Sequence, residues 1–267
     1  MAFEPTGVMQ MSVRQLMAGV VIALGVFSVP AGAVTFNGSS GSLSASADFE
    51  IVGNNLQVTL TNTSTADTLV PADVLTAVFW TGTSGLTPLS ALLAAGSSVF
   101  YDADGQPAGG NVGGEWGYGQ NTGPGLTNQG ISSSGLGGWF GQPNFNGPDL
   151  ASPAALDGLQ YGILSAGDNT ATGNGGITGS GGLIKNSVVF TLSGLPANFA
   201  LTTIANVFFQ YGTAQTEPGY GGTCTQGEPG CYLNVVPPTV PVPAALPLLL
   251  TALGLGGIAS LRRRRKA

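Results

Sequence analysis

Short segments that alternate apolar and polar residues recur through the middle of the chain, and they restrict the fold more than any other feature. Ser42–Ile51 alternates in this way, Leu56–Thr61 alternates again, and Asn54-Asn55 between them tolerates the positive φ of a tight turn, so the pattern predicts a β-hairpin. Four further runs are rich in branched or aromatic residues and end at turn-forming residues: Val74–Trp80, Leu159–Leu164, Ser187–Leu192 and Ile204–Tyr211. Six or more such strands predict a mainly β chain folded as an antiparallel β-sandwich.

One segment has the pattern of a helix instead. In Pro88–Ala95, Pro88 suits the first helical turn, and three leucines share one helical face. Thr87 can cap the segment and Gly96 can end it. We therefore expect a short helix here.

Glycine is dense between residues 105 and 182, where Trp116, Tyr118 and Trp139 interrupt it. Such a segment is either a set of long surface loops, held to the strands by their aromatic side chains, or a partly disordered insertion. We expect held loops, because a free linker has no need of two tryptophans.

The charge distribution excludes several partners and several kinds of catalysis. The chain has 7 lysines and arginines, 13 aspartates and glutamates, and no histidine. Lys185 is the only cation between residues 34 and 261, whereas every acid except Glu4 lies there. Such an acidic body disfavours nucleic acid and anionic membrane surfaces, and it suits divalent cations or neutral polymers better. Without histidine, Ser-His-Asp and Cys-His catalysis and imidazole-containing zinc sites are excluded.

The N-terminal residues have the arrangement of a secretory signal peptide. The apolar run Leu16–Val29 follows Arg14 and precedes the small-residue pattern Ala31-Gly32-Ala33. We expect signal peptidase to cut after Ala33 and translation to start naturally at Met11. A buried core helix is the alternative.

The C-terminal residues have the arrangement of a membrane anchor. The uncharged run Ala244–Leu261 is long enough to cross a bilayer as a helix. Arg262, Arg263, Arg264 and Arg265 follow it at once and predict a cytoplasmic end. Together with the signal peptide, this places the precursor in the inner membrane with its body on the non-cytoplasmic side.

The order of parts at this end, Pro241-Val242-Pro243, an apolar helix and an arginine cluster, resembles the PEP-CTERM protein-sorting signal. The resemblance covers residues 240–267 and is to variants of the signal in which an apolar residue, here Val242, replaces the acid between the prolines. It implies recognition by an exosortase, a membrane-embedded transpeptidase-like enzyme of Gram-negative bacteria that cuts near the Pro-x-Pro motif. The strand-rich body also resembles the ectodomains that precede such signals. A plain single-pass anchor is the alternative.

Cys224 and Cys231 are the two cysteines of the chain. In an exported, oxidising compartment they most simply form a local disulfide, because Pro229-Gly230 between them favours a turn. Free or intermolecular thiols are the alternative. Two cysteines do not complete a tetrahedral metal site, and we predict neither a metal nor a cofactor.

Two motifs of the glycine-rich region suggest ligands. Aromatic faces stack on sugar rings and a carboxylate accepts hydroxyl hydrogen bonds, so Trp116 and Tyr118 beside Glu115 are candidate carbohydrate contacts, with loop anchors as the alternative. The sequence Asp102-Ala103-Asp104-Gly105 starts like a calcium loop but lacks the later ligands, and it predicts an exposed turn. No spacing selects a pair of glycosidase carboxylates.

These features divide the chain into a signal peptide (1–33), a β-rich exported domain (34–236) and a sorting signal (237–267). We expect a non-enzymatic protein of the cell surface or extracellular matrix, associated with exopolysaccharide in a biofilm. A carbohydrate-binding module or a simply anchored adhesin is one alternative, and a surface enzyme is another.

Overall fold

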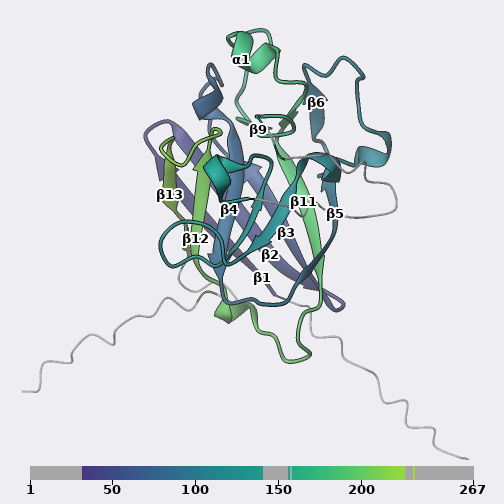
Figure 1. The fold of residues 1–267 in the computed structure, drawn as a ribbon, viewed down its shortest axis with the longest axis vertical. Helices are drawn as coiled ribbons and strands as arrows, with labels where there is room; N and C mark the ends of the chain where they lie inside the picture. Colours follow the sequence, from purple (N-terminus) through teal and green to yellow (C-terminus); the bar gives the residue numbers. More distant parts are fainter. Residues whose placement is uncertain (1–31, 141–155, 157, 226–230, 232–267) are drawn as a thin grey trace, which may run out of the picture. The chain divides into compact units, whose positions relative to one another are not determined.

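A computed structural model describes residues 32–140, 156, 158–225 and 231, which form two facing β-sheets. The first sheet has the strand order β14-β1-β2-β3-β11-β5, and all its neighbouring strands are antiparallel (Figure 1). Its strands are β1 (Ala33–Ser40), β2 (Leu43–Val52), β3 (Asn55–Asn62), β5 (Thr87–Leu93), β11 (Ser187–Ser193) and β14 (Thr223–Cys224).

The second sheet is mixed. Its strand order is β13-β12-β4-β9-β10-β6, with β8 pairing with β4 and β7 with β8, and β9 and β10 run parallel. Its strands are β4 (Leu75–Thr81), β6 (Ser98–Phe100), β7 (Gly117–Gln120), β8 (Gln129–Ser132), β9 (Ile163–Leu164), β10 (Leu183–Lys185), β12 (Ala205–Tyr211) and β13 (Gly219–Gly221). The described helices are α1 (Gly175–Thr178) and five 3₁₀ turns: η1 (Pro71–Asp73), η2 (Ala108–Gly110), η3 (Gly113–Glu115), η4 (Leu136–Gly138) and η5 (Leu201–Thr203).

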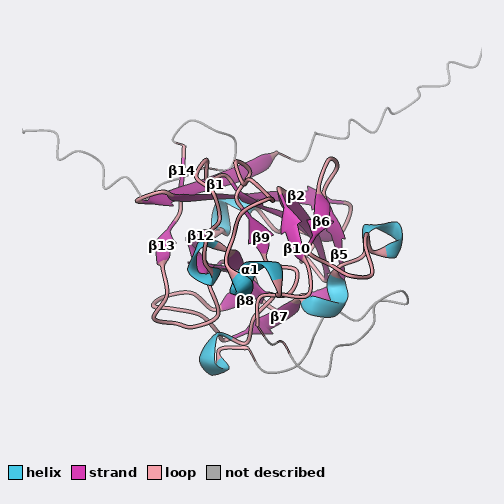
Figure 2. Ribbon diagram, turned by 90° about the horizontal axis from the view of Figure 1, so that it is seen from above, coloured by secondary structure: helices cyan, strands magenta, loops and turns pink. Residues whose placement is uncertain are grey.

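The main core lies between the sheets, which appear as separate layers in Figure 2. Alternate residues of β3 and of β11 are buried, as expected for strands with one face in the core. The ring of Phe49 on β2 meets the ring of Trp80 on β4 edge-on, with centroids 5.5 Å apart. Burial of such aromatic and aliphatic side chains is the main driving force for packing the two sheets.

β4 is buried on both faces, which explains why its sequence is an almost unbroken apolar run. One face lies in the main core. On the other face, Phe79 contacts Trp139 and Phe140 from the glycine-rich segment, with ring centroids 5.4 and 5.7 Å away. The described part of this segment is therefore held to the sheets by aromatic side chains.

The prediction of a mainly β chain is confirmed, and most of the predicted strands are present. The hairpin forms between β2 and β3, but its turn is Gly53-Asn54 rather than Asn54-Asn55. Gly53 has the positive φ of 62°, which glycine adopts without strain, and Asn55 pairs with Val52. The run Leu159–Leu164 is strand only at β9, because the residues before it form a turn.

The helix predicted over Pro88–Ala95 is wrong, because this segment is the edge strand β5. It pairs with β11 and places Ala91 in the core, whereas Leu89 and Leu92 remain 41% and 40% exposed. The leucines therefore do not form one buried face. Pairing with the free edge of β11 outweighs a weak helical preference, and Pro88 is tolerated on an edge strand beside a register shift between Thr191 and Leu192.

Both predicted targeting segments lie outside the described residues, except for Gly32 and Ala33 at the end of the predicted signal peptide. This holds for residues 1–31, which include the apolar run and Ala31, and for the sorting signal at 237–267. Ala33 is the first residue of β1, where it pairs with Glu50. Within the part of the chain that the structure describes, no helix is long and apolar enough to cross a membrane.

Candidate functional site

Two loops meet where β3 leaves the first sheet and β9 leaves the second, and polar groups join them. The side-chain amide of Asn62 donates to the main-chain oxygen of Ile163 at 2.9 Å. The hydroxyl of Ser165 donates to the main-chain oxygen of Ser64 at 2.5 Å. A Cβ atom on Gly167 would lie 2.3 Å from the main-chain oxygen of Thr65, so only glycine permits this close approach. We call residues 62–70 and 163–174 the loop junction.

Two aspartates bind the loops reciprocally. The amide of Thr68, next to Asp67, donates to Oδ1 of Asp168 at 2.8 Å. The amide of Asn169, next to Asp168, donates to Oδ1 of Asp67 at 2.8 Å. The hydroxyl of Thr172 donates to Oδ2 of Asp67 at 2.6 Å. Each carboxylate is therefore oriented by the loop that carries the other.

The two carboxyl groups are close enough for each to affect the pKa of the other, and Asp168 is the buried one. Asp168 is only 4% exposed, and its Oδ2 receives no hydrogen bond from any described residue. Burial and the neighbouring Asp67 raise the pKa of Asp168, although the Thr68 amide opposes this. Hydrogen bonds from Thr172 and Asn169 lower the pKa of Asp67. We call these residues the aspartate pair.

Two other titratable groups lie near the aspartate pair. The ammonium of Lys185 donates to the main-chain oxygen of Asp168 at 2.6 Å. The hydroxyl of Tyr101 donates to the main-chain oxygen of Thr170 at 3.0 Å, and burial followed by the charges of the pair raises the pKa of Tyr101. Both groups are therefore hydrogen-bonded to the main chain of the loop that carries Asp168, and not to its carboxylate.

A cavity of about 240 Å³ adjoins the pair on the Asp67 side. Its wall includes a second carboxylate, Asp73, whose Oδ2 accepts the amides of Leu69 and Val70 at 3.1 and 3.2 Å. The cavity is lined by Ser42, Leu43, Ser64, Ala66, Asp67, Thr68, Leu69, Asp73 and Ser165. It gives water and small ions access to Asp67.

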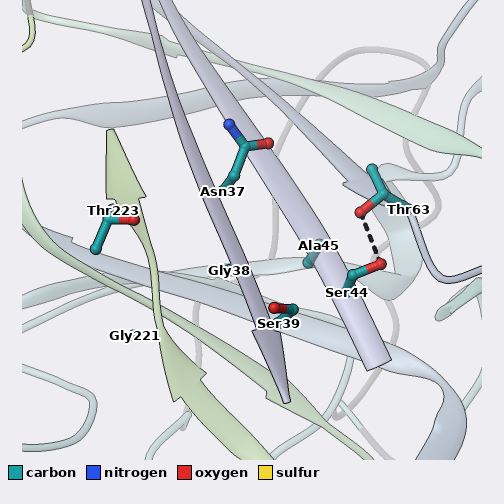
Figure 3. Close-up of a pocket in the computed structure, with 8 residues that line it drawn as sticks. All are labelled: Asn37, Gly38, Ser39, Ser44, Ala45, Thr63, Gly221 and Thr223. Carbon is teal, nitrogen blue, oxygen red and sulfur yellow. Dashed lines mark hydrogen bonds between the residues drawn. The ribbon is translucent and has the colours of Figure 1, made fainter. Parts of the chain in front are cut away.

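A second cavity, of about 450 Å³, is lined by hydroxyls, an amide and main chain, with no charged side chain (Figure 3). The hydroxyl of Thr63 donates to the hydroxyl of Ser44 at 3.1 Å across its wall. Its lining residues are Asn37, Gly38, Ser39, Ser44, Ala45, Thr63, Gly221 and Thr223. Such a surface offers donors and acceptors to a neutral, hydroxyl-rich ligand.

The structure does not support the predicted carbohydrate contacts at Trp116 and Tyr118. Both side chains lie in the core, Trp116 packing edge-on against Phe190 and Tyr118 hydrogen-bonded to Gln129. Because neither ring presents a free face to solvent, neither can stack on a sugar. Trp116 anchors its segment to the core, which was the alternative interpretation, and Tyr118 is part of strand β7.

The remaining sequence motifs have local structural roles. Cys224 and Cys231 are joined by a disulfide. The Asp102–Gly105 motif is a turn in which the carboxylate of Asp102 accepts the amide of Asp104 at 2.9 Å and the hydroxyl of Tyr161 at 3.1 Å. Among the described residues no group of three or more acids, cysteines or histidines is placed to hold a metal ion.

Sequence reasoning missed the aspartate pair. Asp67 and Asp168 are far apart in the chain, and each belongs to a Ser-x-x-Asp segment, Ser64–Asp67 and Ser165–Asp168. That repeated spacing was visible, but it is common in turns and does not reveal which turns meet.

The predicted processing residues Ala31, Pro241, Val242, Pro243 and the four arginines Arg262–Arg265 lie outside the described residues. Comparison with known proteins adds no relative: no family, no curated protein and no solved structure matches this chain.

Proposed function

We propose that this chain is an exported, non-enzymatic protein of the cell surface or extracellular matrix, released or transferred there by an exosortase. The observation that carries the proposal is the order of parts in residues 240–267, a Pro-x-Pro motif, an apolar run and an arginine cluster. The signal-peptide pattern before Val34 supports it, because an exosortase substrate must first cross the inner membrane.

Each end has a separate task in this proposal. Ala31 and Ala33 present small side chains to signal peptidase. Pro241-Val242-Pro243 marks the second cut, the apolar run holds the precursor in the inner membrane, and the arginines stop translocation. The body between the ends, a sandwich-like fold with a disulfide, is suited to an oxidising exterior.

The test is intact-mass measurement of the protein recovered from the cell surface and medium of its native host, with and without reduction. We expect a species that starts at Val34 and ends near Pro241–Pro243, with extra mass at the new C-terminus if it is covalently attached. As a control, substitution of Pro241 and Pro243 by alanine should leave the C-terminal segment uncut. Recovery of a membrane-bound wild-type species that retains Arg262–Arg265 would make this a simply anchored protein and reject exosortase processing.

A second candidate function is binding of a neutral extracellular polysaccharide at the hydroxyl-lined cavity. The uncharged lining of this cavity favours it, and the exposed side chains of Asn37 and Ser39 form part of that lining (Figure 3). Replacing both by alanine should reduce retention on matrix polymer, whereas Trp116→Phe should not. Equal retention of all three proteins would reject this site.

A further inference from the structure

The aspartate pair lacks a positive charge where its geometry requires one. Asp168 is 4% exposed, its Oδ2 receives no hydrogen bond from the described residues, and reciprocal amide hydrogen bonds hold its carboxyl group near that of Asp67. Asp67 is half-buried and Asp168 is buried, and two neighbouring carboxylates of which one is buried repel each other unless a proton or a cation lies between them. A proton or a cation beside this buried, unpaired oxygen would therefore be stabilised.

Among the residues that the structure describes, no side-chain cation has that role. Lys185 is the only lysine or arginine between residues 34 and 261, and its ammonium is hydrogen-bonded to the main-chain oxygen of Asp168. The described donors that reach the pair's carboxylates are amides and hydroxyls, and all of them are neutral. Tyr101 and Asp73, the other titratable groups facing the pair, supply no positive charge.

The surroundings supply oxygen ligands and access. Hard divalent cations take carboxylates, main-chain oxygens, hydroxyls and water, and calcium accepts irregular arrangements of them. The cavity is lined by Asp67, though not by Asp168, and it can hold the waters that complete the coordination at Asp67. Magnesium fits less well because it demands a near-ideal octahedron.

We propose that Asp67 and Asp168 bind a divalent cation of the calcium type, which ties residues 62–70 to residues 163–174. With two carboxylates the site is weak, and a dissociation constant of about 0.1 to 1 mM is expected, as for extracellular calcium modules. The cation would fix the connection from β3 to the connection between β9 and β10. This inference does not depend on exosortase processing.

The test uses the full-length chain in non-ionic detergent and metal-free buffer, with urea unfolding followed by tryptophan fluorescence. At calcium ten times the dissociation constant, the folding equilibrium of the wild type should shift by roughly elevenfold toward the folded state. Asp168→Asn should abolish the shift. It should also make the calcium-free protein more stable than the wild type, because the asparagine amide can donate to Asp67 while its oxygen still accepts the Thr68 amide.

Asp104→Asn is the matched control, since it removes the same charge from an exposed turn and should keep the full calcium response. Terbium supplies a reading that does not depend on any variant, because Tyr101 lies near enough to the pair to sensitise its luminescence, and calcium should displace it. A calcium response absent from the wild type, or equal in Asp168→Asn and Asp104→Asn, would overturn the proposal. A wild type without a calcium response would mean that a shared proton, and not a cation, neutralises the pair. Equal responses in the two variants would mean that calcium is attracted diffusely to the acidic surface.

Discussion

At the scale of single residues, the aromatic side chains of the glycine-rich segment turn inward. Trp116 is buried against Phe190, with ring centroids 4.8 Å apart, and no acceptor among the described residues reaches its Nε1–H. The sequence indicated a role for this tryptophan, but it did not indicate whether the side chain is buried in the core or exposed to solvent. Exposure depends on which strands a loop crosses, and short-range patterns do not encode that.

Truncating Trp116 should destabilise the fold strongly. Trp116→Ala opens a large cavity and is expected to cost about 3 to 5 kcal/mol in the free energy of unfolding. Trp116→Phe should cost much less, because it keeps most of the ring contact and loses no hydrogen bond. Urea unfolding of the two variants measures the difference, and similar losses in both would mean that the indole nitrogen has a partner.

Alkaline pH should weaken the fold through Tyr211. Burial raises the pKa of Tyr211 to about 12, above its usual value of about 10. The unfolded chain therefore loses this proton first as pH rises. The stabilisation is complete below about pH 10 and falls by about 1.4 kcal/mol per pH unit until the folded state also ionises.

Unfolding free energies measured from pH 8 to pH 12 check this expectation. Tyr211→Phe should reduce the slope above pH 10, at the cost of some stability at neutral pH, because Tyr211 donates to Ser44 and accepts from Tyr220. An unchanged slope in the variant would assign alkaline unfolding to other groups. Tyr161 is the next group to test, because burial and Asp102 raise its pKa to about 12.

At the scale of elements, the edge strand and the loop junction show what local pattern leaves out. The β2–β3 hairpin follows from alternation because its partners adjoin in sequence. The strand β5 does not follow from its local sequence, because its partner β11 lies far along the chain and no short-range pattern predicts their pairing. The junction between residues 62–70 and 163–174 likewise depends on how the connections fold over the sheets.

A single methyl group should separate the two loops of the junction. Gly167→Ala places a Cβ 2.3 Å from the main-chain oxygen of Thr65, and backbone atoms yield poorly, so a loss of about 1 to 3 kcal/mol is expected. Gly175→Ala in α1 is the control, since a Cβ there meets nothing within 4 Å. Amide hydrogen exchange should rise in both loops of the first variant only. Exchange confined to residue 167 would show that the loops are independent.

At the scale of the whole molecule, the class of fold was predictable and the arrangement was not. Strands such as the one predicted at Ser187–Leu192 can be recognised in the sequence, because burial and hence apolar character alternate along a strand. Strand order, the parallel pairing of β9 with β10 and the hydrogen bonds that join the loops of Asp67 and Asp168 arise from long-range packing. The disulfide between Cys224 and Cys231 could be predicted from the sequence because both cysteines lie in one short segment.

Removing this disulfide should lower stability moderately. Because the loop it closes is short, Cys224→Ser with Cys231→Ser is expected to cost near the lower end of about 2 to 4 kcal/mol. Reduction of the wild type should give the same loss in thermal or urea unfolding. A much larger loss in the double variant than after reduction would indicate that the serines themselves disturb the buried site.

In the precursor proposed above, which residues 237–267 would hold in the membrane, the same bond would decide how force reaches the fold. Tension enters at Cys231 and crosses the sulfur bridge to Cys224, which is paired with Phe36 of β1, so the segment between the cysteines carries no load. After reduction, that segment could extend by up to about 3.5 Å per residue before force was transmitted to the sheet. The bridge thus shortens and stiffens the tether at the point where it joins the body.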